Sequence, residues 1–249
     1  MARFSSKLKA RLESDFTRSR EGARELYLGA LLVPSASALV RELAQLEHSP
    51  GQRFGNRASV VTLGLKGLPE MVARRGLRGG IAARVLSQLY FGFRPRAVFE
   101  LALTAEARAR GVPTAQPMGA VVDWVAPFAY RSWYLTRKEP GVTLWEFARS
   151  QPPPSGCEQV LEGAREAIVA MYQAGVYHAD LNLHNLFVRS GASGPEVIIL
   201  DLDKARLFDR ALGSKQRLRI QARLLRSVRK LDPRGQFFNA QALARLGLQ

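Results

Sequence analysis

The sequence predicts an α+β fold, because helical and strand patterns follow one another along the chain. Over residues 158–174 apolar side chains recur at helical spacing, and Gly175 follows as a predicted helix stop. Two short apolar runs, 187–188 and 197–200, flank a stretch rich in turn-forming residues, which is typical of a β-hairpin. Another helix is predicted over residues 96–110, which are rich in Ala and Leu and are followed by Gly-Val-Pro.

Three polar residues follow the predicted helix at 158–174 with a characteristic spacing. Asp180 is followed five residues later by Asn185, and Asp201 directly ends the apolar run 197–200. Transfer of a phosphoryl group from ATP to a hydroxyl needs a carboxylate that orients the acceptor and takes its proton, and oxygen ligands that hold Mg²⁺. Mg²⁺ prefers a few hard oxygen ligands. We therefore interpret Asp180 as a catalytic base, and Asn185 with Asp201 as metal ligands.

Three motifs give the chain a family resemblance. They are Tyr-His-Ala-Asp-Leu-Asn-Leu-His-Asn-Leu at 177–186, Leu-Asp-Leu-Asp-Lys-Ala-Arg at 200–206 and Arg-Gly-Gly at 78–80. Over roughly residues 55–231 the chain resembles the lipopolysaccharide core kinases of the protein-kinase-like superfamily, especially those that act on 3-deoxy-D-manno-octulosonic acid (Kdo).

This resemblance implies a protein-kinase-like two-lobed fold, with a small β-rich N-lobe and a larger helical C-lobe. It implies ATP and Mg²⁺ as cofactors, and a sugar hydroxyl of the lipopolysaccharide inner core as the acceptor, with Kdo as the expected sugar. The family's catalytic base falls on Asp180, and its metal ligands fall on Asn185 and Asp201. Asp203 stands where protein kinases have a glycine, which makes a protein substrate less expected.

The resemblance also implies nucleotide-binding residues in the N-lobe. Gly55 begins a turn that is expected to cover phosphates, although the repeated glycines of a protein-kinase loop are absent. Arg74 replaces the lysine of the family's third strand, and a guanidinium can bind phosphate oxygens through two nitrogens at once. Glu100, in the predicted helix, is the expected ion-pair partner of Arg74, and Glu106 is the alternative.

We expect the chain to be organised in three parts. These are a basic and helical N-terminal extension (1–50), a kinase-like N-lobe (51–138) and a kinase-like C-lobe with a basic C-terminal helix (139–249). A chain of 249 residues that is 47% hydrophobic can bury a sizeable core. In the basic helix, one face is expected to dock on the core or to enter lipid headgroups; it carries Leu218, Ala222, Leu225 and Val228.

The charge of the chain predicts an anionic partner. Lys and Arg number 37 against 21 Asp and Glu, so the net charge is +16. We expect an anionic glycolipid substrate, lipid A-core, and an anionic membrane surface, where each basic residue gains about 1 kcal/mol. A specific nucleic acid is not expected, because only 8% of residues are aromatic and no motif interleaves them with basic residues.

The expected location is cytoplasmic and peripheral on the inner membrane. An ATP-using enzyme belongs in the cytoplasm, and the sequence contains no uninterrupted apolar stretch of about 18 residues that could span a bilayer. The single cysteine, Cys157, excludes a disulfide within the chain.

Three alternatives to a lipopolysaccharide kinase stay open on the sequence. A kinase of the same fold could act on another small molecule or on a protein. A metal-dependent hydrolase could use His178, Asp180, His184 and Asp201, because imidazole and carboxylate suit Zn²⁺ or Mn²⁺. A basic binding module could retain the motif without chemistry, although the intact Asp180, Asn185 and Asp201 argue against this.

Overall fold

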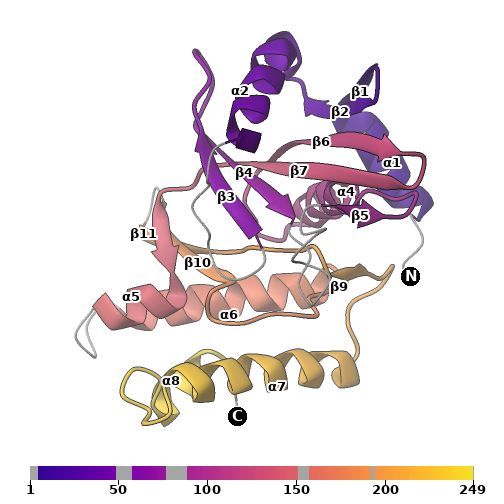
Figure 1. The fold of residues 1–249 in the computed structure, drawn as a ribbon. Coiled ribbons are helices and arrows are strands. Elements are labelled where there is room, and N and C mark those ends of the chain that lie inside the picture. Colours follow the sequence, from indigo (N-terminus) through magenta and orange to yellow (C-terminus); the bar gives the residue numbers. More distant parts are fainter. Residues whose placement is uncertain (1–4, 49–57, 77–88, 151–156, 192–193, 249) are drawn as a thin grey trace. The chain divides into compact units, whose positions relative to one another are not determined.

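The computed structural model describes residues 5–48, 58–76, 89–150, 157–191 and 194–248. The chain divides into two compact units. Unit 1 comprises Met1–Glu106 and Gln116–Lys138, and unit 2 comprises Ala107–Ala115 and Glu139–Gln249. Helices and antiparallel strands alternate along both units (Figure 1), so the predicted α+β class is confirmed.

Unit 1 is built on one antiparallel sheet. Among the described residues its strands run in the order β1-β2-β6-β7-β4-β3, and β5 pairs with β7 beside this path. The bounds are β1 Phe16–Glu21, β2 Arg24–Gly29, β3 Ala58–Leu63, β4 Met71–Gly76, β5 Tyr90–Phe91, β6 Pro117–Ala126 and β7 Ala129–Arg137. Helices α1 Ser6–Asp15, α2 Ala36–His48 and α4 Arg96–Ala109 accompany the sheet, with the short 3-10 helix η1 at Val33–Ser35.

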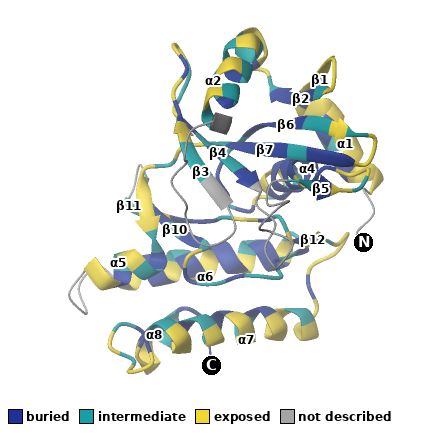
Figure 2. Ribbon diagram, in the orientation of Figure 1, coloured by how far each residue is buried: buried dark blue, intermediate teal, exposed yellow. Residues whose placement is uncertain are grey.

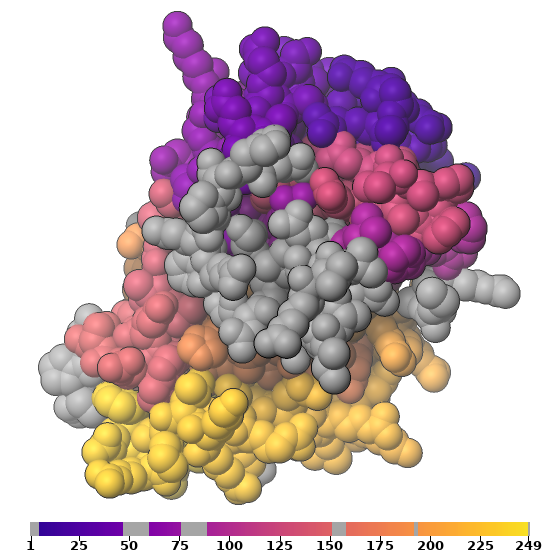
Figure 3. Space-filling view, in the orientation of Figure 1, coloured from indigo at the N-terminus to yellow at the C-terminus, as the bar shows by residue number. Residues whose placement is uncertain are grey.

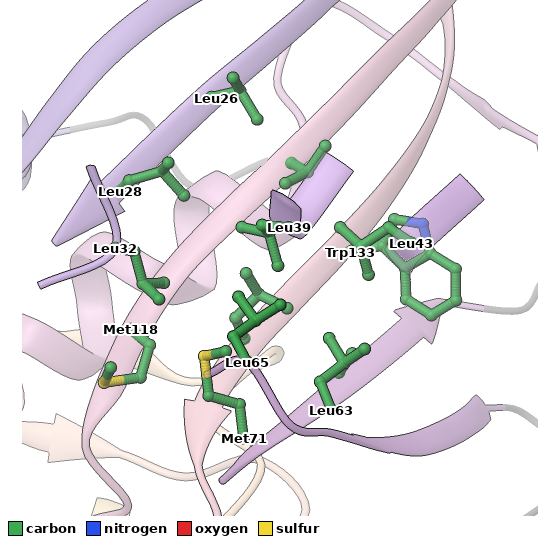
Figure 4. Close-up of a cluster of buried hydrophobic side chains, with 13 residues drawn as sticks. Leu26, Leu28, Leu32, Leu39, Leu43, Leu63, Leu65, Met71, Met118 and Trp133 are labelled. Atoms are coloured by element: carbon green, nitrogen blue, oxygen red, sulfur yellow. The ribbon is translucent and has the colours of Figure 1, made fainter. Parts of the chain in front are cut away.

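The N-terminal segment, expected to be basic and helical, contains the helices α1 and α2 but also the strands β1 and β2. Strand β2 pairs with β6 through five consecutive residue pairs, from Arg24↔Asp123 to Leu28↔Gly119, and β1 pairs with β2, so residues 16–29 contribute two strands to the sheet. Apolar side chains of the N-terminal segment also build the core of unit 1. Leu26 and Leu28 of β2 and Leu39 and Leu43 of α2 pack with Trp133 of β7 and its neighbours (Figure 4).

The same finding shows that unit 1 extends beyond the expected N-lobe at 51–138. Strands β1 and β2 join its sheet, and residues of β2 and α2 join its core. The sequence predicted the helix at 96–110 correctly: α4 spans Arg96–Ala109 and is followed by Gly111, whose φ of 84° is one that glycine adopts without strain.

Unit 2 combines helices with two small sheets. Strands β8 Gly141–Thr143, β10 Leu186–Gly191 and β11 Gly194–Ile199 pair in the order β11-β10-β8, and β9 Val176–Tyr177 pairs with β12 Arg206–Leu207. The helices are α5 Leu144–Ser150, α6 Cys157–Gln173, α7 Ser214–Leu231 and α8 Ala240–Arg245. Helix α6 packs against β11 and α8. The predicted helix, loop and hairpin are therefore α6, residues 174–185 and β10–β11.

Gly175 ends α6 for a steric reason. Its φ is 72°, and a Cβ atom there would lie 2.5 Å from the carbonyl oxygens of both Phe208 and Arg210. Only glycine fits this close approach of two backbone segments.

Helix α7 docks on the core, one of the two expected outcomes, but of the expected face only Val228 is buried. The buried side chains are Ile220, Leu224 and Val228, which recur every four residues, whereas Leu218 is 63% exposed. The opposite side of α7 faces solvent (Figure 2). No helix within the described part of the chain is long and apolar enough to cross a membrane.

Candidate active site

The loop between α6 and the hairpin is held by hydrogen bonds to one carbonyl group. The backbone oxygen of Asp180 accepts a hydrogen bond from Nδ2 of Asn182 and another from Nδ2 of Asn185, each at 2.9 Å. The Asn185 N–H in turn donates to the Asn182 carbonyl oxygen at 3.0 Å. Because the Asn185 nitrogen donates into the loop, the carbonyl oxygen Oδ1 is the atom of this amide that can bind a metal ion.

The register of the hairpin brings Asn185 and Asp201 to the same end of two strands. Leu186 pairs with Ile199, and the Leu200 N–H donates to the Asn185 carbonyl oxygen at 2.8 Å. Asp201 follows directly. Its φ of 59° makes it the only non-glycine residue with positive φ among those described. Such backbone strain persists where the surroundings impose it, often at functional sites.

His178 connects the two halves of this site. Its side chain is 1% exposed, its Nε2 lies 3.0 Å from the Leu200 carbonyl oxygen, and its Nδ1 accepts a hydrogen bond from the Asp180 N–H at 3.2 Å. These partners fix the neutral tautomer with the proton on Nε2. Burial lowers the pKa of His178 below its usual 6.5, although the Leu200 carbonyl and the nearby carboxylates, Asp201 first among them, oppose this shift.

The role of His178 contradicts the hydrolase alternative. Both ring nitrogens of His178 are engaged by backbone groups, so neither can bind Zn²⁺ or Mn²⁺. Across the described ranges, no group of three or more His, Cys, Asp or Glu side chains is placed to hold a metal ion. His178 therefore positions the backbone of Asp180 and of the strand end before Asp201.

Two cations contact the carboxylate of Asp180. Nη1 of Arg223, on α7, lies 2.7 Å from Oδ1, and Nζ of Lys204, in the turn after Asp201, lies 3.6 Å from Oδ2. One turn further along α7, the Ser227 hydroxyl accepts a hydrogen bond from the Leu183 N–H at 3.3 Å. Sequence reasoning missed these three residues, although Arg223 and Ser227 have the i, i+4 spacing of one helix face.

In unit 1, Arg74 and Glu100 form an ion pair. Nη2 of Arg74 on β4 bonds both carboxylate oxygens of Glu100 on α4, whose side chain is buried. Glu106, the alternative partner, instead accepts a hydrogen bond from Nε of Arg11 at 2.9 Å. The predicted pair is thus present. Gly55 and the Arg-Gly-Gly motif at 78–80 lie outside the described residues.

Fold and site together define a phosphotransferase of the kinase class. A buried histidine, His178, links the backbone of Asp180 on a loop to the strand end before Asp201, and the side-chain amide of Asn185 bonds the Asp180 carbonyl oxygen. In the other unit, a strand cation pairs with a helix glutamate. Phosphoryl transfer depends mainly on positioning and charge, and residue types of this kind can supply both.

Comparison with known proteins identifies the family. Residues 46–244 match the model of the lipopolysaccharide kinase (Kdo/WaaP) family. The chain belongs to this family, and the protein is a phosphotransferase with an alcohol group as acceptor.

Individual relatives agree with this assignment. The chain is 30% identical over 190 residues to the 3-deoxy-D-manno-octulosonic acid kinase of Xylella fastidiosa (strain 9a5c), covering 72% of each chain. It is 31% identical over 192 residues to the enzyme of the same name from Xanthomonas axonopodis pv. citri (strain 306), covering 72% of this chain and 73% of the relative. The solved structure of WaaP in complex with acyl carrier protein aligns with a TM-score of 0.54 and 18% identity, over 82% of this chain and 80% of that one. The protein therefore has the fold of this kinase.

Proposed function

We propose that the protein transfers the γ-phosphoryl group of ATP to a hydroxyl of Kdo in the inner core of lipopolysaccharide. One observation carries this proposal: His178 bonds both the Asp180 backbone and the residue before Asp201, so the two carboxylates belong to one hydrogen-bonded unit. The names of the two bacterial relatives support Kdo as the acceptor sugar.

Each site residue has a role in this proposal. Asp180 orients the acceptor hydroxyl and accepts its proton as the new bond to phosphorus forms. Asn185 and Asp201 would hold Mg²⁺, which neutralises charge on the phosphates when bound; an amide oxygen and a carboxylate fit this hard ion. Arg74, oriented by Glu100, binds phosphate oxygens of the nucleotide. Gly55 retains its proposed role in covering the phosphates.

The protein is also proposed to act at the cytoplasmic face of the inner membrane, where its lipid A-core acceptor would be anchored. Helix α7 supports this, because Ser214–Leu231 contains no acidic residue and the C-terminal residues, drawn yellow in Figure 3, lie at the surface. The exposed basic residues of α7 attract anionic headgroups; they are Lys215, Arg217, Arg219, Arg223, Arg226, Arg229 and Lys230.

A transfer assay tests the catalytic proposal. Purified protein with labelled Mg-ATP should add one phosphate to a Kdo-bearing lipid A acceptor. Asp180→Asn should lower the rate by about 10²- to 10⁴-fold, the usual contribution of a general base. Asp209→Asn, on an exposed residue after β12, is the matched control and should keep full activity. Transfer to a protein or an aminoglycoside, with Kdo left unmodified, would refute the proposed acceptor.

A further inference from the structure

The carboxylate of Asp180 lies beside two cationic side chains, Arg223 and Lys204. Arg223 and Lys204 are both within 4 Å of its two oxygens, so two cations face one anion. Arg223 uses Nη1 for Asp180, and within the described chain it has no second ion-pair partner. A guanidinium has five N–H donors. The arrangement therefore retains unused N–H donors of Arg223 beside the proposed catalytic base.

We propose that Arg223 and Lys204 form the subsite that binds the carboxylate group of the acceptor sugar acid. This inference rests on the proposed function, in which a sugar acid presents its hydroxyl to Asp180. Without added cations, the acceptor carboxylate and the Asp180 carboxylate would repel each other in one site. An arginine can hold a carboxylate through two parallel hydrogen bonds, which orients the sugar as well as attracting it.

The placement of Arg223 suits this role. Its side chain is 44% exposed and that of Lys204 is 48% exposed, so both can be reached from solvent. Helix α7 is nevertheless fixed to the catalytic loop, because Leu224 is buried and Ser227 bonds the Leu183 N–H. The guanidinium therefore stands on a rigid element beside the carboxylate that orients the acceptor.

Binding of free Kdo and of its methyl ester, measured by calorimetry without ATP, tests the subsite apart from the transfer reaction. Wild-type protein should prefer Kdo to the ester. Arg223→Gln should weaken Kdo binding by about 10- to 100-fold, the worth of a charged hydrogen bond, and should bind the ester almost as wild type does. Arg226→Gln, also on α7 and exposed, should change neither affinity.

Steady-state kinetics shows whether Arg223 and Lys204 bind the carboxylate of the acceptor or the phosphates of the nucleotide. In the transfer reaction, Arg223→Gln should raise KM for the acceptor and leave KM for ATP unchanged. A rise in KM for ATP alone would assign the cations to nucleotide phosphates and overturn the proposal. Equal losses for Kdo and its ester would also overturn it, because the two residues would then act only on Asp180. Kdo binding that depends on Arg223 without any phosphate transfer would support the subsite and refute the proposed reaction.

Unit 1 has an exposed aromatic corner that the catalytic site does not explain. It is formed by Phe91 (45% exposed), Phe93 (78%), Val125 (57%) and Phe128 (54%). The corner is built on paired strands: Phe91 lies opposite Ala129, the Gly92 N–H donates to the Phe128 carbonyl oxygen at 2.7 Å, and the Phe91 and Phe128 rings stack with centroids 6.3 Å apart. The apolar side chains are therefore held outward by ordered backbone.

The charge around this corner is mainly positive, and the acidic residue next to it in sequence, Asp123, forms an ion pair with Arg24. Residues 89–96 and 124–131 include Arg94, Arg96 and Arg131 and no Asp or Glu. Aromatic side chains suit the boundary between headgroups and acyl chains, and arginines beside them suit lipid phosphates. We infer that this corner inserts into the surface of an anionic bilayer. The inference gives the proposed peripheral membrane association a defined contact surface in unit 1.

Vesicle binding tests the aromatic corner without any lipopolysaccharide. Sedimentation with phosphatidylglycerol-containing vesicles should capture the wild-type protein, and the double variant Phe93→Ser/Phe128→Ser should bind at least about tenfold more weakly, as expected from the apolar area lost. The control variant Leu31→Ser changes an exposed leucine of unit 1 that is not part of the aromatic corner, and it should bind as wild type does. Phosphorylation of free Kdo should be unchanged in all three. Unchanged vesicle binding by the double variant, or wild-type dimers that it abolishes, would refute the insertion.

Discussion

At the scale of single residues, the site depends on a histidine that performs no chemistry itself. Both ring nitrogens of His178 form hydrogen bonds with backbone groups. Burial favours the neutral form of this imidazole. The position of Asp180 relative to the strand end before Asp201 is thereby coupled to the protonation state of one imidazole.

This coupling predicts a pH dependence of stability. Because the pKa of His178 is lowered below 6.5 in the folded protein, the unfolded chain binds a proton below that pH before the folded protein does. The contribution of neutral His178 to the free energy of unfolding is therefore complete above about pH 6.5 and is lost as the pH falls below this value. Urea unfolding between pH 5 and 8 should show this loss in wild type and in the control His184→Gln. His178→Gln should be less stable at pH 7.5 but should have a flatter profile; an equally steep profile would contradict this assignment.

The backbone conformation of Asp201 favours glycine, whereas its proposed role in metal binding requires a carboxylate. At a φ of 59° a glycine is unstrained, whereas an alanine suffers a steric penalty of about 1 kcal/mol. Asp201→Gly should therefore unfold at higher denaturant concentration than Asp201→Ala, and both should be inactive for want of the carboxylate. If Asp201→Ala proved the more stable of the two, the backbone would not be strained as described.

At the scale of elements, the glycines that end α4 and α6 allow a matched comparison. Gly111 and Gly175 both have positive φ, but a Cβ at Gly111 would meet nothing within 4 Å, while one at Gly175 would meet two carbonyl oxygens. Gly111→Ala should cost about 1 kcal/mol in the free energy of unfolding, and Gly175→Ala clearly more. If chemical denaturation gave both variants the same loss of unfolding free energy, the backbone near Phe208 would have to move aside for the new Cβ atom without loss of stability.

Elements with a regular apolar pattern were predictable from sequence, and others were not. Helix α6 and the β10–β11 hairpin follow from periodicity and turn residues. Strand β1 was missed because five of its six residues are exposed and polar or charged, so it has no apolar alternation. In α7 two apolar ridges have helical spacing, and only the packing of Ile220, Leu224 and Val228 decides which one is buried.

At the scale of the whole molecule, some residues of the site could be predicted from the sequence and others could not. Asp180 and Asn185 lie within one local motif, and Asp201 lies in a second motif at the end of the hairpin that follows, so their chemistry and order in the sequence identify them together. Arg223 is 43 residues from Asp180 in sequence, and no local pattern connects the two. The net charge of +16 predicted anionic partners, but only the fold shows which basic residues reach the catalytic loop.

The central claim is that Asp180, Asn185 and Asp201 act at one metal–nucleotide site. Binding of Mn²⁺ with a non-hydrolysable ATP analogue, followed by electron paramagnetic resonance, tests it most directly. Asn185→Ala and Asp201→Asn should each weaken Mn²⁺–nucleotide binding by at least about tenfold, since even residues that only orient metal ligands are worth about 10- to 100-fold. Asp180→Asn should bind the metal–nucleotide as wild type does and still fail to transfer phosphate. Equal Mn²⁺ affinity in all four proteins would contradict the account.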